Sequence, residues 1–422
     1  MARTLTPRDG YALMTQLVRQ ATGQGSYAVV DASSFVSAGE TVLATGMENV
    51  FNSINIVLGR LVVAVRPYKG KFLTVQAADS GVYSNRYRKV SFYSKDPLPS
   101  GWFNTDLYTN LADGYTAGDN GGASTKSQWE QHQAMPLEMN FAGSTTWQDC
   151  ITNYENQVKM AFTSVDEWNR FVAGYLAEHA NDIEQQKEEF NRLTVLSKMA
   201  AIYDYAINES VVTEAAVNLT AAYNAYYNLS PAVSSADLLS TYLKEFLEFT
   251  TATIKEYSDR LTDRSARFHN PMTKTVGGVN YSILRHTPKA DQRLILYGPL
   301  FRKAEALVMP EIFGPQYLEM GQNYEMVNYW QFNDGSNDMG INFQTAIYDG
   351  VTGQQKQGAV VQLDYVVGIL FDRDALLTDF QLDDANTTAL EARKGFRNTW
   401  LTISKNAIND PCENAILFYM KD

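Results

Sequence analysis

The strongest hydrophobic pattern in the chain covers residues 164–208. Apolar side chains recur there every three to four positions, with no proline and only one glycine, which is typical of a long amphipathic helix. Ser164 followed by Glu167 fits a capping box at its N-terminus. A helix of this length would measure on the order of 65 Å at 1.5 Å per residue. We therefore expect the other elements to be built along it.

Upstream, the pattern alternates between helix and strand. Residues 40–58 read as a helix, and residues 86–93 read as a strand. Apolar residues alternate with polar ones over residues 135–141, which indicates a second strand. Between the two strands lies a glycine-rich segment whose tip we place at residues 113–122. Because compact domains rarely hold such long loops without a use for them, we predict a projecting hairpin.

Downstream, the predicted elements mix both types, so the expected fold class is α+β. Residues 210–229 read as a mixed strand and helix, and residues 234–262 as one helix. The strands predicted there cover residues 280–284, 293–297, 341–348 and 359–371.

Composition excludes several classes of protein. The two cysteines make no disulfide framework, and with the four histidines they show no metal-ligand spacing. No phosphate-binding loop, dinucleotide fingerprint or catalytic constellation is present, so we expect no enzyme and no cofactor. The longest apolar run, residues 54–65, is interrupted by Arg60 and is too short to span a bilayer. We expect a chain made in the cytoplasm, without a membrane partner.

Charge is segregated along the chain. Residues 60–95 hold eight basic residues and one acid, whereas residues 164–209 hold nine acids and four bases. Opposite charges on two elements favour docking, either within one chain or between copies. The aromatic residues among the basic ones also allow a groove for single-stranded nucleic acid, although the net charge of −12 opposes binding to phosphates.

One short cluster, Asp372-Arg373-Asp374, combines two carboxylates with a guanidinium after an apolar strand. It could bind a cation or a substrate, but a salt-bridged turn at the strand end is the commoner structure, and we favour that interpretation.

The order of these parts resembles the major capsid protein of tailed bacteriophages, which has the Hong Kong 97-type fold. Residues 43–72 and 366–380 look similar in particular to capsid proteins of short-tailed gut phages. The resemblance implies an N-terminal arm, an extended β-hairpin loop, a long spine helix in a peripheral domain, and a mixed axial domain. The implied boundaries are residues 1–45 for the arm, 46–65 for the peripheral-domain entry, 66–142 for the extended loop, 143–229 for the peripheral domain with its spine helix at 164–208, 230–370 for the axial domain and 371–422 for the return to the peripheral domain.

The resemblance also implies a structural function, with hexamers and pentamers of the chain enclosing double-stranded DNA without reading its sequence. The expected location is the virion, assembled in the bacterial cytoplasm. A portal protein is an implied partner. No long helical leader precedes the arm, so we expect a separate scaffolding protein. Some family members crosslink through a lysine of the extended loop. Lys126 lies in that loop, but we match no partner asparagine or assisting glutamate.

On this basis we expect contacts between subunits at the hairpin and on the spine helix. The candidate residues are Arg86, Arg88, Lys89, Asp113, Tyr115, Asp119, Lys126, Trp129, Glu184, Glu188 and Glu189. The rival hypothesis is a non-enzymatic protein that binds glycans or single-stranded nucleic acid. It would use the stretch 60–95 together with Trp102, Trp129, Trp147 and Trp330.

Overall fold

The computed structural model describes residues 7–23, 28–46, 49–50, 53, 70–76, 86–95, 135–142, 145–276, 279–302, 324–331, 337–350, 352–391 and 393–422. Helices and strands are mixed along the chain, as the sequence predicts. The longest helix, α5 (Val165–Tyr203), continues into a π-helical turn at Asp204–Asn208, which confirms the predicted long helix. The Ser164 side chain accepts a hydrogen bond from the Glu167 amide and so caps α5.

A five-stranded mixed sheet forms the centre of the body, in the order β5 (Ala216–Asn218), β15 (Ala415–Met420), β12 (Tyr365–Asp372), β8 (Gln292–Tyr297) and β9 (Tyr324–Val327). All six residues of β15 are buried. Ala415, Leu417 and Tyr419 point into one hydrophobic core, whereas Ile416, Phe418 and Met420 point into another. A strand covered on both faces needs apolar residues at every position, which explains the unbroken apolar run.

The two cores are closed by different elements. The first includes the C-terminal part of α5 and residues of β10 (Ile341–Tyr348) and β11 (Gln355–Leu363). The second includes α6 (Leu219–Tyr226), α7 (Ser235–Leu238), α8 (Leu243–Arg260) and α9 (Gly298–Arg302). Gly368 in β12 is needed for close strand packing, since a Cβ atom there would lie 2.7 Å from the Ile295 carbonyl oxygen.

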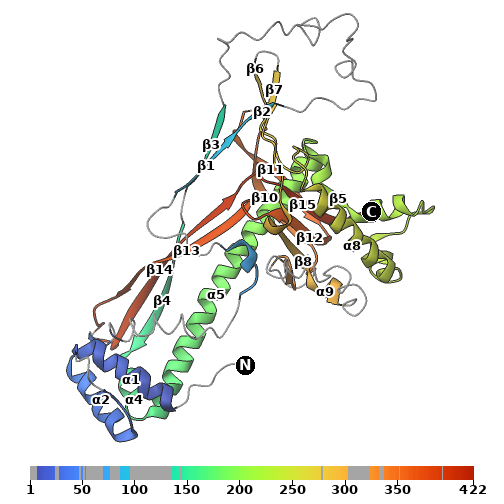
Figure 1. Cartoon of the computed structure of the whole chain (residues 1–422). Helices are drawn as coiled ribbons and strands as arrows, with labels where there is room; N and C mark the ends of the chain where they lie inside the picture. The colour runs from blue at the N-terminus through green and yellow to red at the C-terminus, as the bar shows by residue number, and fades with distance from the viewer. Residues whose placement is uncertain are drawn as a thin grey trace, which may run out of the picture.

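A second sheet runs alongside α5 (Figure 1) and consists of β13 (Leu376–Thr387), β14 (Phe396–Asn409) and β4 (Thr145–Tyr154). It packs on the helix through Phe380, whose ring centre lies 5.6 Å from that of Phe190. The Lys405 ammonium lies 4.8 Å from the centre of the Phe190 ring. The sequence pattern did not predict β4, because its residues are largely polar.

At the far end of α5, three helices form a separate hydrophobic cluster (Figure 1): α1 (Pro7–Thr22), α2 (Ala32–Ala44) and α4 (Glu155–Ala161). The expected helix at residues 40–58 was wrong as one continuous element: α2 begins at Ala32 and ends at Ala44, and helical residues resume at 49, 50 and 53, after Gly46 with its φ of +97°. Asp31 and Ser34 form the capping box that starts it. The polar segment before residue 40 is therefore helical, because Phe35, Ala38 and Val42 bury one face.

The predicted hairpin strands are confirmed. β1 (Arg86–Phe92) pairs antiparallel with β3 (Pro136–Ala142), and the pair extends away from the body (Figure 1). A small sheet lies beside it, made of β2 (Ser94–Lys95), β7 (Val279–Ser282) and β6 (Lys274–Val276). The predicted hairpin tip at residues 113–122 lies outside the described residues.

Two other predicted elements are divided in the structure. The single helix expected at residues 234–262 is α7 and α8, separated by a turn in which the Asp237 carbonyl accepts from the amides of Ser240, Thr241 and Tyr242. The single strand expected at residues 359–371 is β11 and β12, which belong to different sheets. They separate at Asp364, whose carbonyl accepts a hydrogen bond from the Asn337 side chain.

Candidate functional site

The hairpin is fixed to the body by a cluster of charged side chains, which we call the anchor cluster: Lys89, Lys198, Arg285, Asp410 and Glu413. Lys89 comes from β1, Lys198 from α5, Arg285 from the segment after β7, and the two acids from the turn between β14 and β15. The cluster therefore joins four segments that lie far apart in the sequence.

Lys89 is the hairpin's contribution. Its ammonium lies 2.6 Å from an Asp410 carboxylate oxygen and 2.7 Å from a Glu413 carboxylate oxygen. The Asp410 side chain is fully buried. Although burial alone would lower the pKa of Lys89, the two carboxylates outweigh it and raise that pKa. Lys89 is thus a charged side chain held by two acids of its own chain.

The remaining cations complete the cluster from the other side. The Lys198 ammonium donates to the Asp410 carbonyl oxygen at 2.5 Å. Complete burial lowers the pKa of Lys198 to about 8, against the opposing effect of Asp410 and Glu413. Arg285 lies 3.0 Å from Glu413 and donates to the Ser91 hydroxyl of β1 at 2.5 Å. Arg285 therefore reaches the hairpin strand directly, whereas Lys198 holds the backbone of Asp410.

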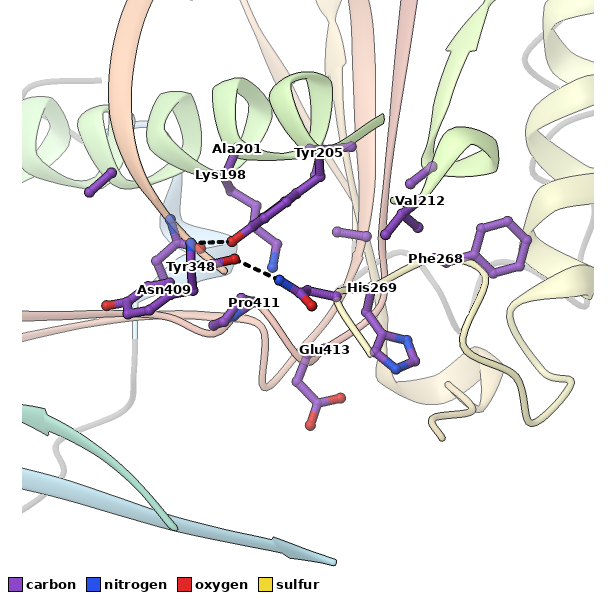
Figure 2. Close-up of a pocket in the computed structure, with 15 residues that line it drawn as sticks. Lys198, Ala201, Tyr205, Val212, Phe268, His269, Tyr348, Asn409, Pro411 and Glu413 are labelled. Atoms are coloured by element: carbon purple, nitrogen blue, oxygen red, sulfur yellow. Dashed lines mark hydrogen bonds between the residues drawn. The ribbon is translucent and has the colours of Figure 1, made fainter. Parts of the chain in front are cut away.

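A small cavity of about 30 Å³ lies beside the cluster (Figure 2). Lys198, Tyr205, His269, Tyr348 and Asn409 are among its lining residues, and Tyr205 accepts a hydrogen bond from the Tyr348 amide at 2.6 Å. Pockets for small-molecule substrates measure roughly 300–1,000 Å³. This cavity has room for a water molecule and not for a substrate.

Two potentially reactive side chains near the cavity, Cys412 and His269, have pKa values far from neutral. Burial raises the pKa of the Cys412 thiol to about 12, which leaves no thiolate at neutral pH. Burial also lowers the pKa of His269 to about 4, although its ring nitrogens lie 2.8 Å from the Asn414 side-chain oxygen and 2.7 Å from the Ile283 carbonyl oxygen.

The predicted contact residues of the hairpin have different surroundings. Arg86 and Arg88 lie two positions apart in β1, and Lys89 directly follows Arg88. Arg88 is exposed and pairs with Glu138 of β3 at 2.6 Å, whereas Lys89 belongs to the anchor cluster. The described residues include neither the Arg86 side chain nor the remaining hairpin candidates, which are Asp113, Tyr115, Asp119, Lys126 and Trp129.

The three predicted acids of α5 interact with bases of the same helix. Glu184 lies 3.6 Å from Lys187, and Glu189 lies 3.0 Å from Arg192. Glu188 pairs with Arg192 and also accepts a hydrogen bond from the Lys71 amide at 3.0 Å. The basic stretch 60–95 thus touches the acidic helix within one chain at Lys71. Contact between copies through these acids stays a prediction.

Around Lys71, the segment 70–76 crosses α5 as a strap. Glu325 accepts hydrogen bonds from the amides of Phe72 and Thr74 at 2.6 and 3.3 Å. The Arg192 guanidinium lies 4.0 Å from the Tyr329 ring centre and 5.3 Å from that of Phe72. The guanidinium is therefore enclosed by the strap, which leaves it unable to reach a partner subunit.

The cluster Asp372-Arg373-Asp374 is a salt-bridged turn, as favoured from the sequence. Arg373 lies 3.2 Å from Asp291 and 3.4 Å from Asp374. Asp372 accepts from the Thr287 hydroxyl at 2.7 Å and from the Asp374 amide at 2.8 Å. Across the described ranges, no group of three or more potential metal-binding side chains comes together.

The tryptophans that the rival glycan-binding hypothesis requires do not form a common surface among the described residues. Trp330 is fully buried and donates its indole N–H to the Val366 carbonyl oxygen at 2.8 Å. Trp147 is half-buried in β4, and Trp102 and Trp129 lie outside the described residues. Among the described helices, none is both long and apolar enough to cross a membrane.

Sequence reasoning missed the key residues of the anchor cluster. Lys198 lies on a helix that it did predict, but Arg285, Asp410 and Glu413 lie in segments without a periodic pattern. The only signal was a pair of acids in the short segment DPCE, just before the apolar run of β15. Acids in such a segment usually face solvent, so the signal could not identify a buried cluster.

Comparison with known proteins gave structural similarities alone. No model of a protein family matches the chain, and no curated protein does. A chain in the capsid structure of Staphylococcus phage Andhra is 12% identical, with a TM-score of 0.49 and 83% of each chain covered. A chain in the mature capsid of bacteriophage PhiM1 is 11% identical, with a TM-score of 0.40, covering 84% of this chain and 88% of that one.

Proposed function

We propose that this chain is the repeating subunit of a protein shell, specifically the major capsid protein of a tailed bacteriophage. The observation that carries the proposal is the anchored hairpin. β1 and β3 extend from the body, and yet a buried set of ionic contacts fixes their base. A projecting two-stranded element gains little stability for a monomer, whereas in a shell it can reach a neighbouring subunit.

The extended shape of the rest of the molecule supports the same function. α5 and the sheet β13–β14–β4 connect the body to the helices α1, α2 and α4 at the opposite end (Figure 1). Such a layout offers a large perimeter for contacts with several neighbours.

In this proposal the parts take the roles that the resemblance implies. Residues 1–45 form the N-terminal arm, 66–142 the extended loop, 143–229 the peripheral domain with the spine helix, and 230–370 the axial domain. Residues 46–65 and 371–422 enter and complete the peripheral domain. The shell consists of hexamers and pentamers, encloses double-stranded DNA, carries a portal, and is assembled on a separate scaffolding protein.

The geometry weakens the rival nucleic-acid groove. Lys89, a central base of the stretch 60–95, is held by Asp410 and Glu413, so its charge is already neutralised. Arg88 is likewise paired with Glu138. A groove for single-stranded nucleic acid requires lysine and arginine side chains that are free to contact its phosphates.

The test is to express the chain alone and together with the protein that the neighbouring gene encodes. The purified material is then imaged by negative-stain electron microscopy. We expect closed particles, at least in the presence of that partner. A chain that stays monomeric by light scattering under all salt and crowding conditions would overturn the proposal. Single-stranded DNA binding without particles would favour the rival.

A sharper test reverses charges on β1 and on α5. We expect Arg86→Glu with Arg88→Glu to raise the concentration needed for assembly, and Glu184→Lys with Glu189→Lys to restore it partly. Glu188 is left unchanged because it is buried against Arg192. Normal assembly of the first variant would contradict a role for these charges between subunits.

A further inference from the structure

The positive charge of the anchor cluster exceeds its negative charge. Lys89, Lys198 and Arg285 are balanced by only two carboxylates, those of Asp410 and Glu413. The side chains of Lys89 and Arg285 are 27% and 22% exposed, so water can solvate part of their charge. Lys198 is only 3% exposed, and its pKa of about 8 leaves most of it charged at neutral pH. The excess charge therefore lies at a buried ammonium, where an uncompensated ion is costly.

Lys198 also has too few hydrogen-bond acceptors. An ammonium carries three N–H donors. Within the described ranges, the Lys198 ammonium has one acceptor, the Asp410 carbonyl oxygen at 2.5 Å. The carboxylates of Asp410 and Glu413 are held instead by Lys89, and that of Glu413 also by Arg285. Because buried polar groups are almost always hydrogen-bonded, a further acceptor is expected beside Lys198.

The cavity of about 30 Å³ that Lys198 lines provides the space for such an acceptor. Tyr205, Asn270 and Asn409 line it as well. The Tyr205 hydroxyl accepts from the Tyr348 amide, so its own hydrogen can be donated to a group in the cavity. The side-chain NH2 groups of Asn270 and Asn409 each donate one hydrogen to a protein acceptor and carry a second one. Donors from α5, from the segment before β6 and from the end of β14 thus line one space.

A monatomic anion fits this cavity better than water does. A water molecule needs acceptors for its own two hydrogens, whereas a halide ion only accepts. Glu413 is the only acid among the described residues that line the cavity, and Figure 2 shows its carboxylate directed away from Lys198 and Tyr205. An anion also balances the excess positive charge, which water cannot do. Phosphate and other polyatomic anions are too large for a space that holds about one water molecule.

We propose that this cavity binds one chloride ion, held by Lys198 and Tyr205 together with the side-chain amides of Asn270 and Asn409. The ion neutralises Lys198 and connects α5 to the turn that carries Asp410. It therefore stabilises the base of the hairpin. The site lies within one chain, so it is independent of the proposed shell function.

The experiment measures chloride binding to the full chain at constant ionic strength. Potassium chloride replaces potassium gluconate, whose anion is too large for the cavity. Thermal unfolding measures the stabilisation, and chlorine NMR line widths measure binding directly. For the wild type we expect the thermal midpoint to rise by about 3 °C or more and to level off as the site fills. Bromide should act as chloride does.

Two variants remove donors without adding bulk. Lys198→Met leaves two cations opposite two acids, so the cluster stays balanced, and Tyr205→Phe removes only the hydroxyl. Each should weaken chloride binding by about tenfold or more, because a hydrogen bond to a charged group is lost. The matched controls are Lys187→Met, on a partly exposed part of α5, and Tyr203→Phe, whose hydroxyl accepts from Lys421 outside the cavity. Neither control should change the affinity.

Two results would overturn the inference. One is a wild-type thermal midpoint and line width that do not distinguish chloride from gluconate, which would leave water as the occupant of the cavity. The other is chloride binding that survives both Lys198→Met and Tyr205→Phe, which would place the ion elsewhere on the chain. Circular dichroism checks folding. If Lys198→Met is misfolded, Tyr205→Phe and the wild-type titration decide.

Discussion

The two ends of α5 are held in different ways. At its N-terminal end, Trp168 stacks on Phe162 with ring centres 5.0 Å apart, within an apolar cluster shared with α1, α2 and α4. At its C-terminal end, Lys198 enters the anchor cluster, and the Asp204 carboxylate accepts from the Ala359 amide at 3.0 Å. One end is fixed mainly by packing, and the other by packing combined with buried charges.

This difference has consequences for stability and for assembly. Apolar packing is non-directional and depends little on pH, so the α1–α2 end should respond to changes in side-chain shape and not to changes in protonation. Buried charges tolerate little displacement, because a cation that loses its partner is left unsolvated. The hairpin is attached at the ionic end, which fixes its direction relative to the body.

The largest expected effect comes from Asp410→Ala. It leaves Lys89 with one carboxylate and removes the acceptor of the Cys412 amide, 2.8 Å away. Removing one partner of a buried pair costs about 3–5 kcal/mol, so we expect a loss in the free energy of unfolding of about 4 kcal/mol by chemical denaturation. Hydrogen exchange should increase first in β1 and β3. An unchanged hairpin would show that the ionic contacts are not its anchor.

The second-largest effect is expected from acid, which should destabilise the C-terminal end of α5, where the buried charges lie. The pKa of His269 is lowered from 6.5 to about 4 in the folded chain, so the unfolded chain binds this proton first as the pH falls. Stability that is fully present above pH 6.5 is then lost progressively towards pH 4, by about 3 kcal/mol in total. We expect the difference in unfolding free energy between the wild type and His269→Gln to change across this window. A difference independent of pH would contradict the prediction.

A packing change at the apolar end should have a smaller effect. A Cβ atom on Gly10 would lie 2.5 Å from the Asn169 side-chain oxygen and 3.0 Å from a Val165 methyl group. Gly10→Ala should therefore push α1 away from α5, at a cost of about 1–3 kcal/mol. Hydrogen exchange should increase in α1 and α2 and stay unchanged in the hairpin. Equal changes at both places would show that the two ends are not independent.

The smallest effect is expected on the exposed face between the two ends. Glu184 and Lys187 lie 3.6 Å apart and are partly exposed, and such pairs contribute about 0.3–0.5 kcal/mol. Glu184→Gln should leave the thermal midpoint within about 1 °C, with Lys187→Gln as the matched control. A larger loss would show that this pair is coupled to the strap at residues 70–76.

Local sequence signals predicted the elements that depend on local physics. The Ser164 cap, the length of α5 and the strands β1 and β3 follow from capping and periodicity, and all are confirmed. Errors arose where tertiary contacts decided the element. β4 is polar and forms because β14 pairs with it. α2 starts eight residues before the predicted helix start at residue 40, because Phe35 and Ala38 are buried on one of its faces.

The sequence by itself determined that this chain is an α+β protein with a long capped helix and a projecting pair of strands. Only the tertiary structure decided which charges meet. The sequence suggested that the basic stretch 60–95 would meet the acidic helix, and within the chain it does so at the Lys71 amide, whereas its Lys89 meets Asp410 and Glu413, more than 300 residues away. Periodicity reports which side of an element is apolar, whereas the partner of a buried charge depends on which distant segments the packed cores bring together.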